Sequence, residues 1–424
     1  MTDVARGELL ALFPPDSSTD ETGMLLLGGC RADTLAAEYG TPVLVVSEHT
    51  IRTRAREYAD GLVSRWPNAR VLFASKAFPC TSVQRLMVEE GLGLDVAGGG
   101  EVRSALKAGA RSADLVLHGN AKTDEDIRQA VHLRMGLVVV DNADDVDRLE
   151  AIVPTGDRQD VLVRVIPGIK ADTHDHVLTG HEESKFGLPL EAATRLIQRI
   201  ESSSRMRMRG LHVHVGSQIM DLDPFVQSVE RLRQLGEFPV YDLGGGLGAR
   251  YTYADQPPSI AQYLDALVSA AHACLPADAR LLIEPGRSIV ASAAATLYHV
   301  VTVKRAAKTF VAVDGGMADN LEVSLFGQRF EAGIVDRLEG ARGETVTVVG
   351  RHCESGDVLV DKVTLSRPKV GDLLAVPATG AYSFTMSNNY NGARRIPVVF
   401  VRDGRARLVV RRETWDDLLA RDVD

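Results

Sequence analysis

Lys76 follows an apolar run, Val71 to Ser75, that has the composition of a buried strand. Ammonium groups are rarely left inside a protein core without a function. The ordinary explanation is a strand that reaches solvent at its end, and the chemical one is a lysine that forms a Schiff base with a carbonyl group. The other residues able to do chemistry decide between these two explanations.

Short apolar runs recur along the chain and alternate with stretches at helical spacing. Eight such runs lie near residues 71–76, 91–96, 115–118, 136–140, 160–166, 208–215, 239–243 and 280–284. This alternation is typical of strand–helix units around a parallel sheet. Eight consecutive units predict an α/β fold with a closed (β/α)8 barrel of the TIM type, with an open doubly wound sheet as the alternative.

Polar residues stand at the ends of these runs. In order they are Lys76, Asp95, His118 with Asn120, Asp141, Arg164, His214, the turn Gly244-Gly245-Gly246, and Glu284. A polar residue after a strand is common, so each is weak evidence alone. Because the carboxyl ends of parallel barrel strands open on one face, together they predict one site at that face.

After about residue 290 the pattern changes to short alternating strands with turn residues, which predicts a C-terminal antiparallel β domain. The expected strands are 309–314, 344–349, 357–364, 372–377, 396–401 and 406–411. We therefore expect residues 40–290 to form the barrel and residues 1–39 and 291–424 to form the β domain.

The composition of the chain limits the kinds of partner that it can bind. The net charge of −9 provides no basic field for nucleic acid or an anionic membrane. The N-terminus lacks a signal pattern, and the long apolar stretch 288–303 is interrupted and too short to span a bilayer. The four cysteines are scattered, which argues against disulfides and structural zinc. We expect a cytoplasmic protein with a small-molecule partner.

Three segments suggest how an aromatic anion would be held. The glycines of residues 242–248 allow backbone N–H groups to point at a phosphate, although a plain tight turn is equally consistent. Glu284, which precedes a Pro-Gly turn, is either a solvated residue or a carboxylate that keeps a pyridine nitrogen protonated. His212 and His214 share one strand face without a third ligand at metal-binding spacing, so we expect no metal and a stacking role for His214.

Seven motifs occur in a fixed order along the chain. They are Ala-Ser-Lys76-Ala-Phe, His214-Val-Gly-Ser217-Gln, Gly244-Gly-Gly-Leu-Gly, Glu284-Pro-Gly-Arg287, Asp314-Gly-Gly-Met, Cys353-Glu354-Ser-Gly-Asp and Gly380-Ala-Tyr382-Ser-Phe. From about residue 30 to the C-terminus, the ordered set resembles the diaminopimelate decarboxylase branch of the fold type III pyridoxal-phosphate enzymes.

The resemblance implies pyridoxal 5′-phosphate as cofactor, an amino acid as substrate, and a homodimer with shared active sites that the β domain completes. It implies that Lys76, His214 and Cys353 are catalytic, with Cys353 and Glu354 reaching in from the partner protomer. The implied cofactor-binding residues are Lys76, Asp95, His214, Ser217, Gly244, Gly245, Gly246, Glu284, Gly286, Arg287 and Tyr382. The implied substrate-binding residues are Arg287, Glu322, Phe326, Glu354 and Tyr382.

The implied reaction is α-decarboxylation, with Cys353 as the acid that returns a proton to Cα. Racemases of this fold pair the pyridine nitrogen with an arginine, so Glu284 favours loss of carbon dioxide. A racemase and a non-catalytic regulator that binds the cofactor are the competing classes. Regulators of this kind typically lack the lysine or the cysteine, and this chain has both Lys76 and Cys353.

One segment departs from the branch it resembles. Glu322 and Phe326 stand where diaminopimelate decarboxylases typically carry an arginine and a tyrosine that bind the distal carboxylate of the substrate. An anion facing a carboxylate is repulsive. We therefore expect an altered distal-end specificity, for a neutral or cationic group, in a specialised biosynthetic pathway. The alternative is a genuine meso-diaminopimelate decarboxylase that yields L-lysine, with the pocket rebuilt by Arg351 or the loop at residues 388–389.

Overall fold

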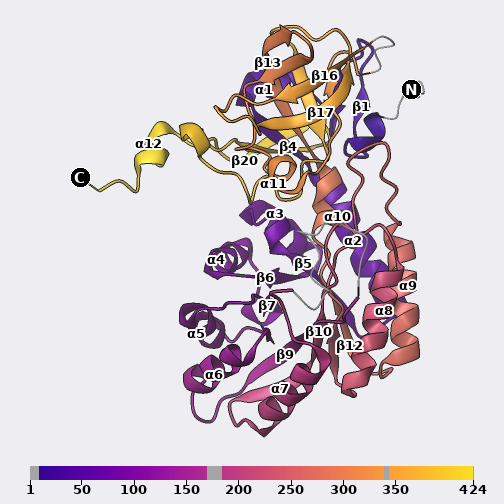
Figure 1. The fold of residues 1–424 in the computed structure, drawn as a ribbon, viewed down its shortest axis with the longest axis vertical. Helices are drawn as coiled ribbons and strands as arrows, with labels where there is room; N and C mark the ends of the chain where they lie inside the picture. Colours follow the sequence, from indigo (N-terminus) through magenta and orange to yellow (C-terminus); the bar gives the residue numbers. More distant parts are fainter. Residues whose placement is uncertain (1–8, 170–183, 339–342, 424) are drawn as a thin grey trace. The chain divides into compact units, whose positions relative to one another are not determined.

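The structure is a computed structural model that describes residues 9–169, 184–338 and 343–423 (Figure 1). The chain divides into two compact units. The barrel unit comprises residues 54–248 and 257–288, and the β unit comprises residues 1–53, 249–256 and 289–424. The barrel unit begins at residue 54 rather than at the expected residue 40, because strand β4 (Val43–Ser47) pairs with β13 and β19 of the β unit.

The predicted barrel is confirmed: eight strands close in the order β10-β11-β12-β5-β6-β7-β8-β9, and every neighbouring pair is parallel. The strands are β5 (Ala69–Ala74), β6 (Gly93–Val96), β7 (Leu115–Leu117), β8 (Leu137–Val140), β9 (Gln159–Val165), β10 (Met206–Val213), β11 (Val240–Asp242) and β12 (Arg280–Ile283). The pairing of Leu281 with Ala69 closes the ring. Each predicted run corresponds to one of these strands.

Helices lie around the outside of the barrel strands (Figure 1). They are α3 (Thr81–Glu89), α4 (Gly99–Ala108), α5 (Asp124–Leu133), α6 (Ala143–Ile152), α7 (Leu190–Ser202), α8 (Asp223–Leu232) and α9 (Ile260–Cys274), together with the later part of α2 (Glu48–Arg65). The sequence specifies several of their ends. Thr123 and Asp126 form a capping box at the start of α5, and Ser259 and Gln262 form another at the start of α9.

Apolar side chains fill the interior of the barrel. Six strands each contribute one buried residue to this cluster: Leu72, Val116, Val139, Leu162, Val240 and Leu282. Such packed layers make a barrel interior a core rather than a pore. Polar residues are therefore confined to the strand ends, where the carboxyl ends of all eight strands open together.

The β unit contains a three-stranded sheet and a larger sheet of nine strands. The small sheet is β1 (Ser18–Thr19), β2 (Leu25–Leu27) and β3 (Cys30–Arg31). The large sheet consists of β4 with β13 (Ala294–Arg305), β14 (Thr309–Val313), β15 (Gly333–Ile334), β16 (Glu344–Val349), β17 (Val358–Leu365), β18 (Leu373–Pro377), β19 (Val398–Arg402) and β20 (Arg405–Val410). Short helices in the described part of this unit include α1 (Ala32–Tyr39), α11 (Glu322–Phe326) and α12 (Trp415–Leu419), and α10 (Arg287–Val290) lies at its boundary with the barrel unit.

The expectation of an antiparallel domain is confirmed for most strand pairs and needs one correction. The pairs β14–β16 and β4–β19 are parallel, so the large sheet is mixed. Strand β13, whose first five residues are all buried, was not predicted from the sequence. A strand buried on both faces has no apolar–polar alternation to reveal it. Among the described residues, no helix is both long and apolar enough to cross a membrane.

Candidate active site

Seven charged or titratable side chains lie buried at the carboxyl end of the barrel strands. They are Asp95, His118, Asp141, Arg164, His212, Asp242 and Glu284, each at most 8% exposed. They come from seven successive strands, β6 to β12, so the barrel itself brings together residues that are up to 189 positions apart in the chain. The convergence predicted from the strand ends is present in the barrel unit. It includes His118, His212 and Asp242, to which the sequence analysis gave no role in catalysis or cofactor binding.

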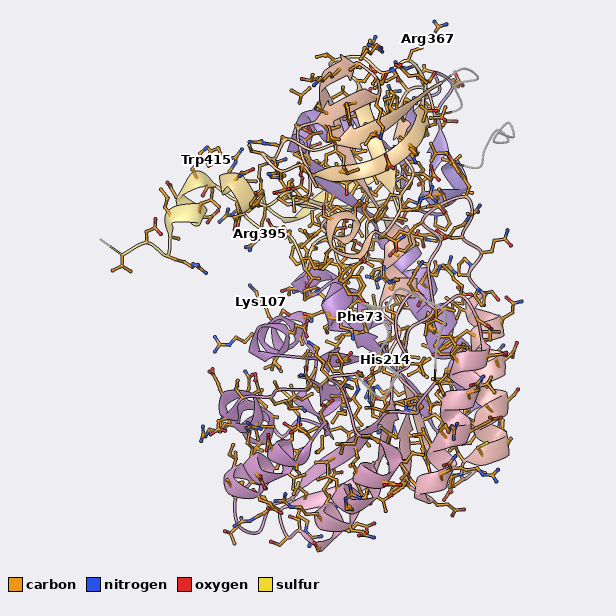
Figure 2. All side chains as sticks on the ribbon, in the orientation of Figure 1. Phe73, Lys107, His214, Arg367, Arg395 and Trp415 are labelled. Carbon is orange, nitrogen blue, oxygen red and sulfur yellow. The ribbon has the colours of Figure 1, made fainter. Side chains whose placement is uncertain are left out.

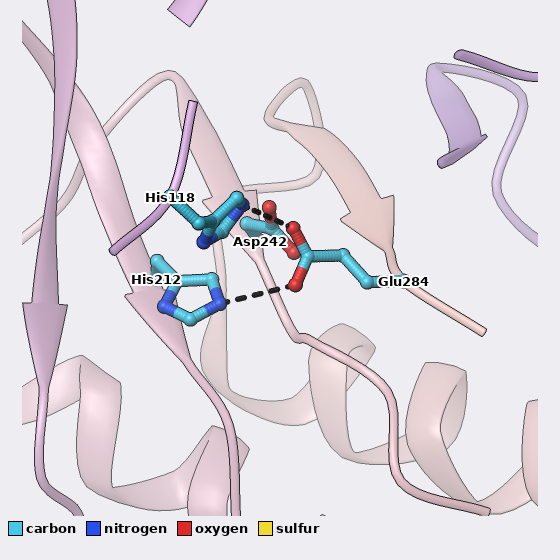
Figure 3. A group of neighbouring side chains, drawn as sticks. All are labelled: His118, His212, Asp242 and Glu284. Atoms are coloured by element: carbon cyan, nitrogen blue, oxygen red, sulfur yellow. Dashed lines mark hydrogen bonds and ion pairs between the residues drawn. The ribbon is translucent and has the colours of Figure 1, made fainter. Parts of the chain in front are cut away.

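Glu284 faces three of these side chains, His118, His212 and Asp242 (Figure 3). Its Oε1 lies 2.6 Å from Nε2 of His118, and its Oε2 lies 3.2 Å from Nε2 of His212. Asp242 lies beside it, and the candidate ligand atoms of all four residues are within 4.8 Å of one another. Because the histidine nitrogens that face the centre are engaged with Glu284, we interpret the group as a hydrogen-bonded network, and the absence of a metal stays a prediction.

The contacts within the network shift the pKa values of its two carboxyl groups in opposite directions. Burial disfavours the charge on Glu284, but His118 and His212 outweigh burial and hold its pKa well below the ordinary value. Burial and the neighbouring Glu284 raise the pKa of Asp242 well above its usual range. The two pKa values thus shift in opposite directions, so that Glu284 is the more acidic carboxyl group and Asp242 the one that more readily keeps a proton, which disfavours two adjacent buried anions.

His214 and the glycine turn form a second part of the site. The Gly245 N–H donates to Nδ1 of His214 over 3.2 Å, and the Gly244 N–H donates to Asp242 over 3.0 Å. Burial, with the charges of Lys76 and Arg164, holds the pKa of His214 well below the ordinary value, so its ring is neutral. A neutral imidazole fixed through Nδ1 is suited to stack on an aromatic cofactor.

The close approach of the strand ends requires glycine in this turn. A Cβ on Gly245 would lie 2.1 Å from the backbone oxygen of Glu284, and one on Gly244 would lie 2.3 Å from that of Val213. Real side chains do not reach such separations, so the turn has no other residue choice. Glycine therefore lets the strand ends approach closely, while the Gly244 and Gly245 N–H groups are held by Asp242 and His214.

Arg287 provides a cation next to this turn. It follows Glu284-Pro-Gly, is 6% exposed, and donates from Nε to Oγ of Ser217 over 3.2 Å. Gly286 packs against Ala74 and Ala77, on either side of Lys76, so that a Cβ at this position would lie 2.9 Å from Ala74. A guanidinium, a hydroxyl and a glycine turn together fit a phosphate group.

Lys76 lies just beyond β5 in a single 3₁₀ turn, residues Ser75–Ala77. Its two neighbours in that turn are buried, whereas Lys76 itself is exposed. The strand thus reaches solvent at the lysine, as the ordinary explanation has it. That position also leaves the amine accessible to a carbonyl compound at the carboxyl end of the barrel. Its role as the covalent anchor stays a prediction from the structure alone.

A buried ion pair supports the strand ends that carry the network. Nζ of Lys122 lies 2.7 Å from Oδ2 of Asp145 and donates to the Gly119 oxygen over 2.6 Å. The same Asp145 oxygen accepts the Asp141 N–H over 3.0 Å. Both charged side chains are 1% exposed or less. The pair therefore ties the loop after His118 to the loop after β8.

We expect Lys122→Met to lower the free energy of unfolding by about 3–5 kcal/mol, because it leaves the Asp145 charge buried without its cation. Chemical denaturation of the holoenzyme measures the loss. Lys107→Met on the outer surface of α4 is the matched control and should change stability by about 0.5 kcal/mol or less (Figure 2). A loss below about 1 kcal/mol for Lys122→Met would contradict a structural role for the pair.

Cys353 lies in an exposed loop of the β unit, between β16 and β17. The loop is fixed from beneath by the buried Asp357, whose carboxylate accepts the N–H groups of Met317 over 2.6 Å and His352 over 2.8 Å. The Cys353 N–H donates to Oδ1 of Asn391 over 2.8 Å. Cys353 is thus an exposed, unpaired cysteine on an anchored loop.

The implied substrate-binding residues Glu322 and Phe326 form the two ends of α11 in the same unit. The Glu322 side chain is buried, at 1% exposure. Ser324 of this helix donates to the Gly356 oxygen over 2.9 Å, which joins α11 to the loop of Cys353 and the exposed Glu354. Tyr382 lies elsewhere in the β unit, half-buried and with a positive φ of 63°. Their arrangement around a substrate stays a prediction.

The barrel unit thus has the features of a pyridoxal-phosphate site: a carboxylate network for a pyridine nitrogen, a fixed neutral histidine and an anion cradle. Residues 48–291 match the family model described as the pyridoxal binding domain of pyridoxal-dependent decarboxylases. The chain belongs to this family of pyridoxal-dependent decarboxylases. It is a carboxy-lyase that uses pyridoxal phosphate. The family match therefore favours the predicted decarboxylase over the racemase and over the non-catalytic regulator.

Relatives along nearly the whole chain are named diaminopimelate decarboxylase. The Actinosynnema pretiosum subsp. auranticum protein is 44% identical over 417 residues, which cover 95% of this chain and 93% of the relative. The Bacillus subtilis protein is 40% identical over 425 residues, which cover 96% and 97%.

Solved structures of enzymes with this name have the same fold. The M. jannaschii enzyme in complex with L-lysine has a TM-score of 0.89 at 28% identity, covering 97% of this chain and 98% of that one. The Helicobacter pylori enzyme complexed with L-lysine has a TM-score of 0.86 at 27% identity, covering 92% and 98%.

Proposed function

We propose that this enzyme removes one carboxyl group of meso-diaminopimelate and yields L-lysine. The observation that carries the proposal is the near-complete coverage by relatives of 40–44% identity that bear the name diaminopimelate decarboxylase. Solved relatives of the same fold bind L-lysine, the product of this reaction. These comparisons favour the alternative of the sequence analysis over the altered specificity that it preferred.

In the proposed mechanism, pyridoxal phosphate supplies the electron sink that accepts the electron pair left behind by carbon dioxide. Lys76 would hold the cofactor covalently through its Nζ, at a position where the amine is accessible to a carbonyl compound. Glu284 would keep a proton on the pyridine nitrogen of the bound cofactor, and the neutral His214 would lie against its ring. These roles follow from the buried, ionised state of Glu284 and from the fixed orientation of the His214 ring.

The remaining residues of the proposed site bind the phosphate of the cofactor or return a proton to the substrate. Arg287 and Ser217 bind the phosphate beside the glycine turn, because a guanidinium, a hydroxyl and a turn without side chains lie together in the barrel unit. Cys353 returns a proton from Sγ to Cα after carbon dioxide has left. We propose that this thiol comes from the partner protomer of a homodimer, and that the enzyme works in the cytoplasm.

A second candidate substrate has a neutral or cationic distal end, and the observation that favours it is Glu322. Its side chain is buried in α11, which a hydrogen bond joins to the Cys353 loop. A fixed anion near the distal end of the substrate would repel a carboxylate, and such contacts cost several kcal/mol. Candidate substrates of this kind are lysine, ornithine, arginine and their acylated or carbamoylated derivatives.

A screen of carbon dioxide release decides between the two candidates. We expect the wild type to turn over meso-diaminopimelate with a higher kcat/KM than lysine, ornithine, arginine or their acylated relatives. Glu322→Arg is the companion variant, and we expect its kcat/KM for meso-diaminopimelate to change by less than about tenfold, or 1.4 kcal/mol. Preference of the wild type for another amino acid, with a gain of tenfold or more for Glu322→Arg, would instead support the second candidate.

A further inference from the structure

Glu284 receives its contacts from strands on different sides of the barrel. His212 and Asp242 come from β10 and β11, the two strands next to β12 on one side. His118 follows β7, which is three strands away in the other direction, so its ring reaches across the strand ends to Glu284 (Figure 3). The His118 contact, at 2.6 Å, is the shorter of the two histidine contacts.

The two histidines lie in different electrostatic surroundings although both are buried. His118 faces two carboxylates, Glu284 at 2.6 Å and Asp95 at 3.8 Å, and these outweigh burial and raise its pKa above the ordinary value. Burial lowers the pKa of His212 to about 3. The two rings are 4.8 Å apart, and two adjacent imidazolium ions in a buried site would repel each other. His118 is therefore the cation of the pair and His212 a neutral donor.

We propose that His118 is a positioning residue for Glu284, an imidazolium that keeps the carboxylate ionised and in place, so that the shared proton stays on the pyridine nitrogen. The inference rests on the proposed role of Glu284 and not on the identity of the substrate. It assigns His212 a weaker role, as a neutral hydrogen-bond donor. The groups that act electrostatically on or with Glu284 are Asp95, His118, Arg164, His212, His214, Asp242 and Tyr263.

The position of the proton between Glu284 and the pyridine nitrogen decides whether the ring is cationic. A carboxylate and a pyridine share a proton either as an ion pair or as two neutral groups, and burial favours the neutral form. A cation in contact with the carboxylate, as His118 is at 2.6 Å, favours the ionised form of Glu284 and would therefore stabilise the ion pair. Each carboxylate oxygen has two acceptor positions, so Glu284 can bind His118 and the pyridine N–H together.

The test compares His118→Gln with His212→Gln, since glutamine replaces a donor in both but removes a charge only from His118. Each variant is reconstituted with pyridoxal phosphate labelled with ¹⁵N at the ring nitrogen, and the ¹⁵N chemical shift is measured. We expect a protonated nitrogen in the wild type and in His212→Gln, and a shift toward the unprotonated value in His118→Gln. We also expect kcat of His118→Gln to fall about tenfold or more, with KM changed less than about threefold, since one unit of proton affinity is a factor of ten.

Each result supports or overturns a defined claim. A protonated nitrogen in the His118→Gln holoenzyme, whatever its thermal stability or cofactor affinity, would overturn the positioning role. A wild type that binds the cofactor but has an unprotonated ring nitrogen would overturn the proposed role of Glu284 itself. If the variants do not fold, neutron diffraction of the deuterated wild-type holoenzyme tests the inference by locating the protons on the two histidines. We expect deuterium on both ring nitrogens of His118 and on only one of His212, and a singly protonated His118 would overturn the inference.

Discussion

Replacing Lys76 by alanine is expected to abolish measurable decarboxylation, with a loss of at least roughly 10²–10⁴-fold in kcat, the range supplied by a positioned proton-transfer group. The reason is that Lys76 is the amine at the carboxyl end of β5, placed by a turn whose other residues are buried. The loss of the covalent anchor adds to the loss of proton transfer. Release of carbon dioxide from the reconstituted variant measures the effect.

The matched control for this variant is Lys107→Ala. Lys107 is exposed on α4, on the outer surface of the same unit (Figure 2). We expect it to retain activity within about twofold, because surface substitutions of this kind change little. Wild-type turnover by Lys76→Ala would remove this lysine from the mechanism.

Glu284→Gln is expected to reduce kcat by roughly 10²–10³-fold, the usual cost of removing one preorganised electrostatic group. An amide cannot carry the negative charge that stabilises a protonated pyridine nitrogen, while it keeps the size of the side chain and one oxygen that can accept from His212 or His118. The variant should therefore still bind the cofactor. Steady-state kinetics, together with the ¹⁵N shift of labelled cofactor, measure both effects.

Glu191→Gln, on the exposed first turn of α7, makes the same chemical change outside the network. It should leave kcat and the ¹⁵N shift unchanged. If Glu284→Gln keeps more than about a tenth of wild-type kcat, the carboxylate is not what keeps the cofactor electron-poor, and the network needs another explanation.

The sequence predicts the barrel well because each strand is buried on both faces and ends in a polar residue. Apolar runs such as 136–140 and 280–284 are visible without any knowledge of tertiary structure, and the parallel fold then determines which ends converge. Glu284 and His214 could be chosen from their positions after such runs. The β unit was predicted less completely, since β4 precedes the barrel in sequence but pairs with β13 and β19.

The roles of His118 and Asp242 could not be found in the same way. His118 follows β7 and is 166 residues before Glu284, and only the closed order of the strands brings their side chains to 2.6 Å. Its charge depends on the nearby Asp95 and Glu284, which sequence spacing does not reveal. The signal available was the coincidence of a histidine and two acids at the carboxyl ends of β6, β7 and β12.

The central claim, that Lys76 anchors the cofactor at the carboxyl end of the barrel, has one direct test. The holoenzyme is reduced with borohydride, digested and analysed by mass spectrometry. The account predicts that the peptide containing Lys76 carries the mass of the reduced cofactor, in proportion to the activity lost on reduction. An unmodified Lys76 peptide from fully active holoenzyme, or the cofactor mass on another lysine, would contradict it.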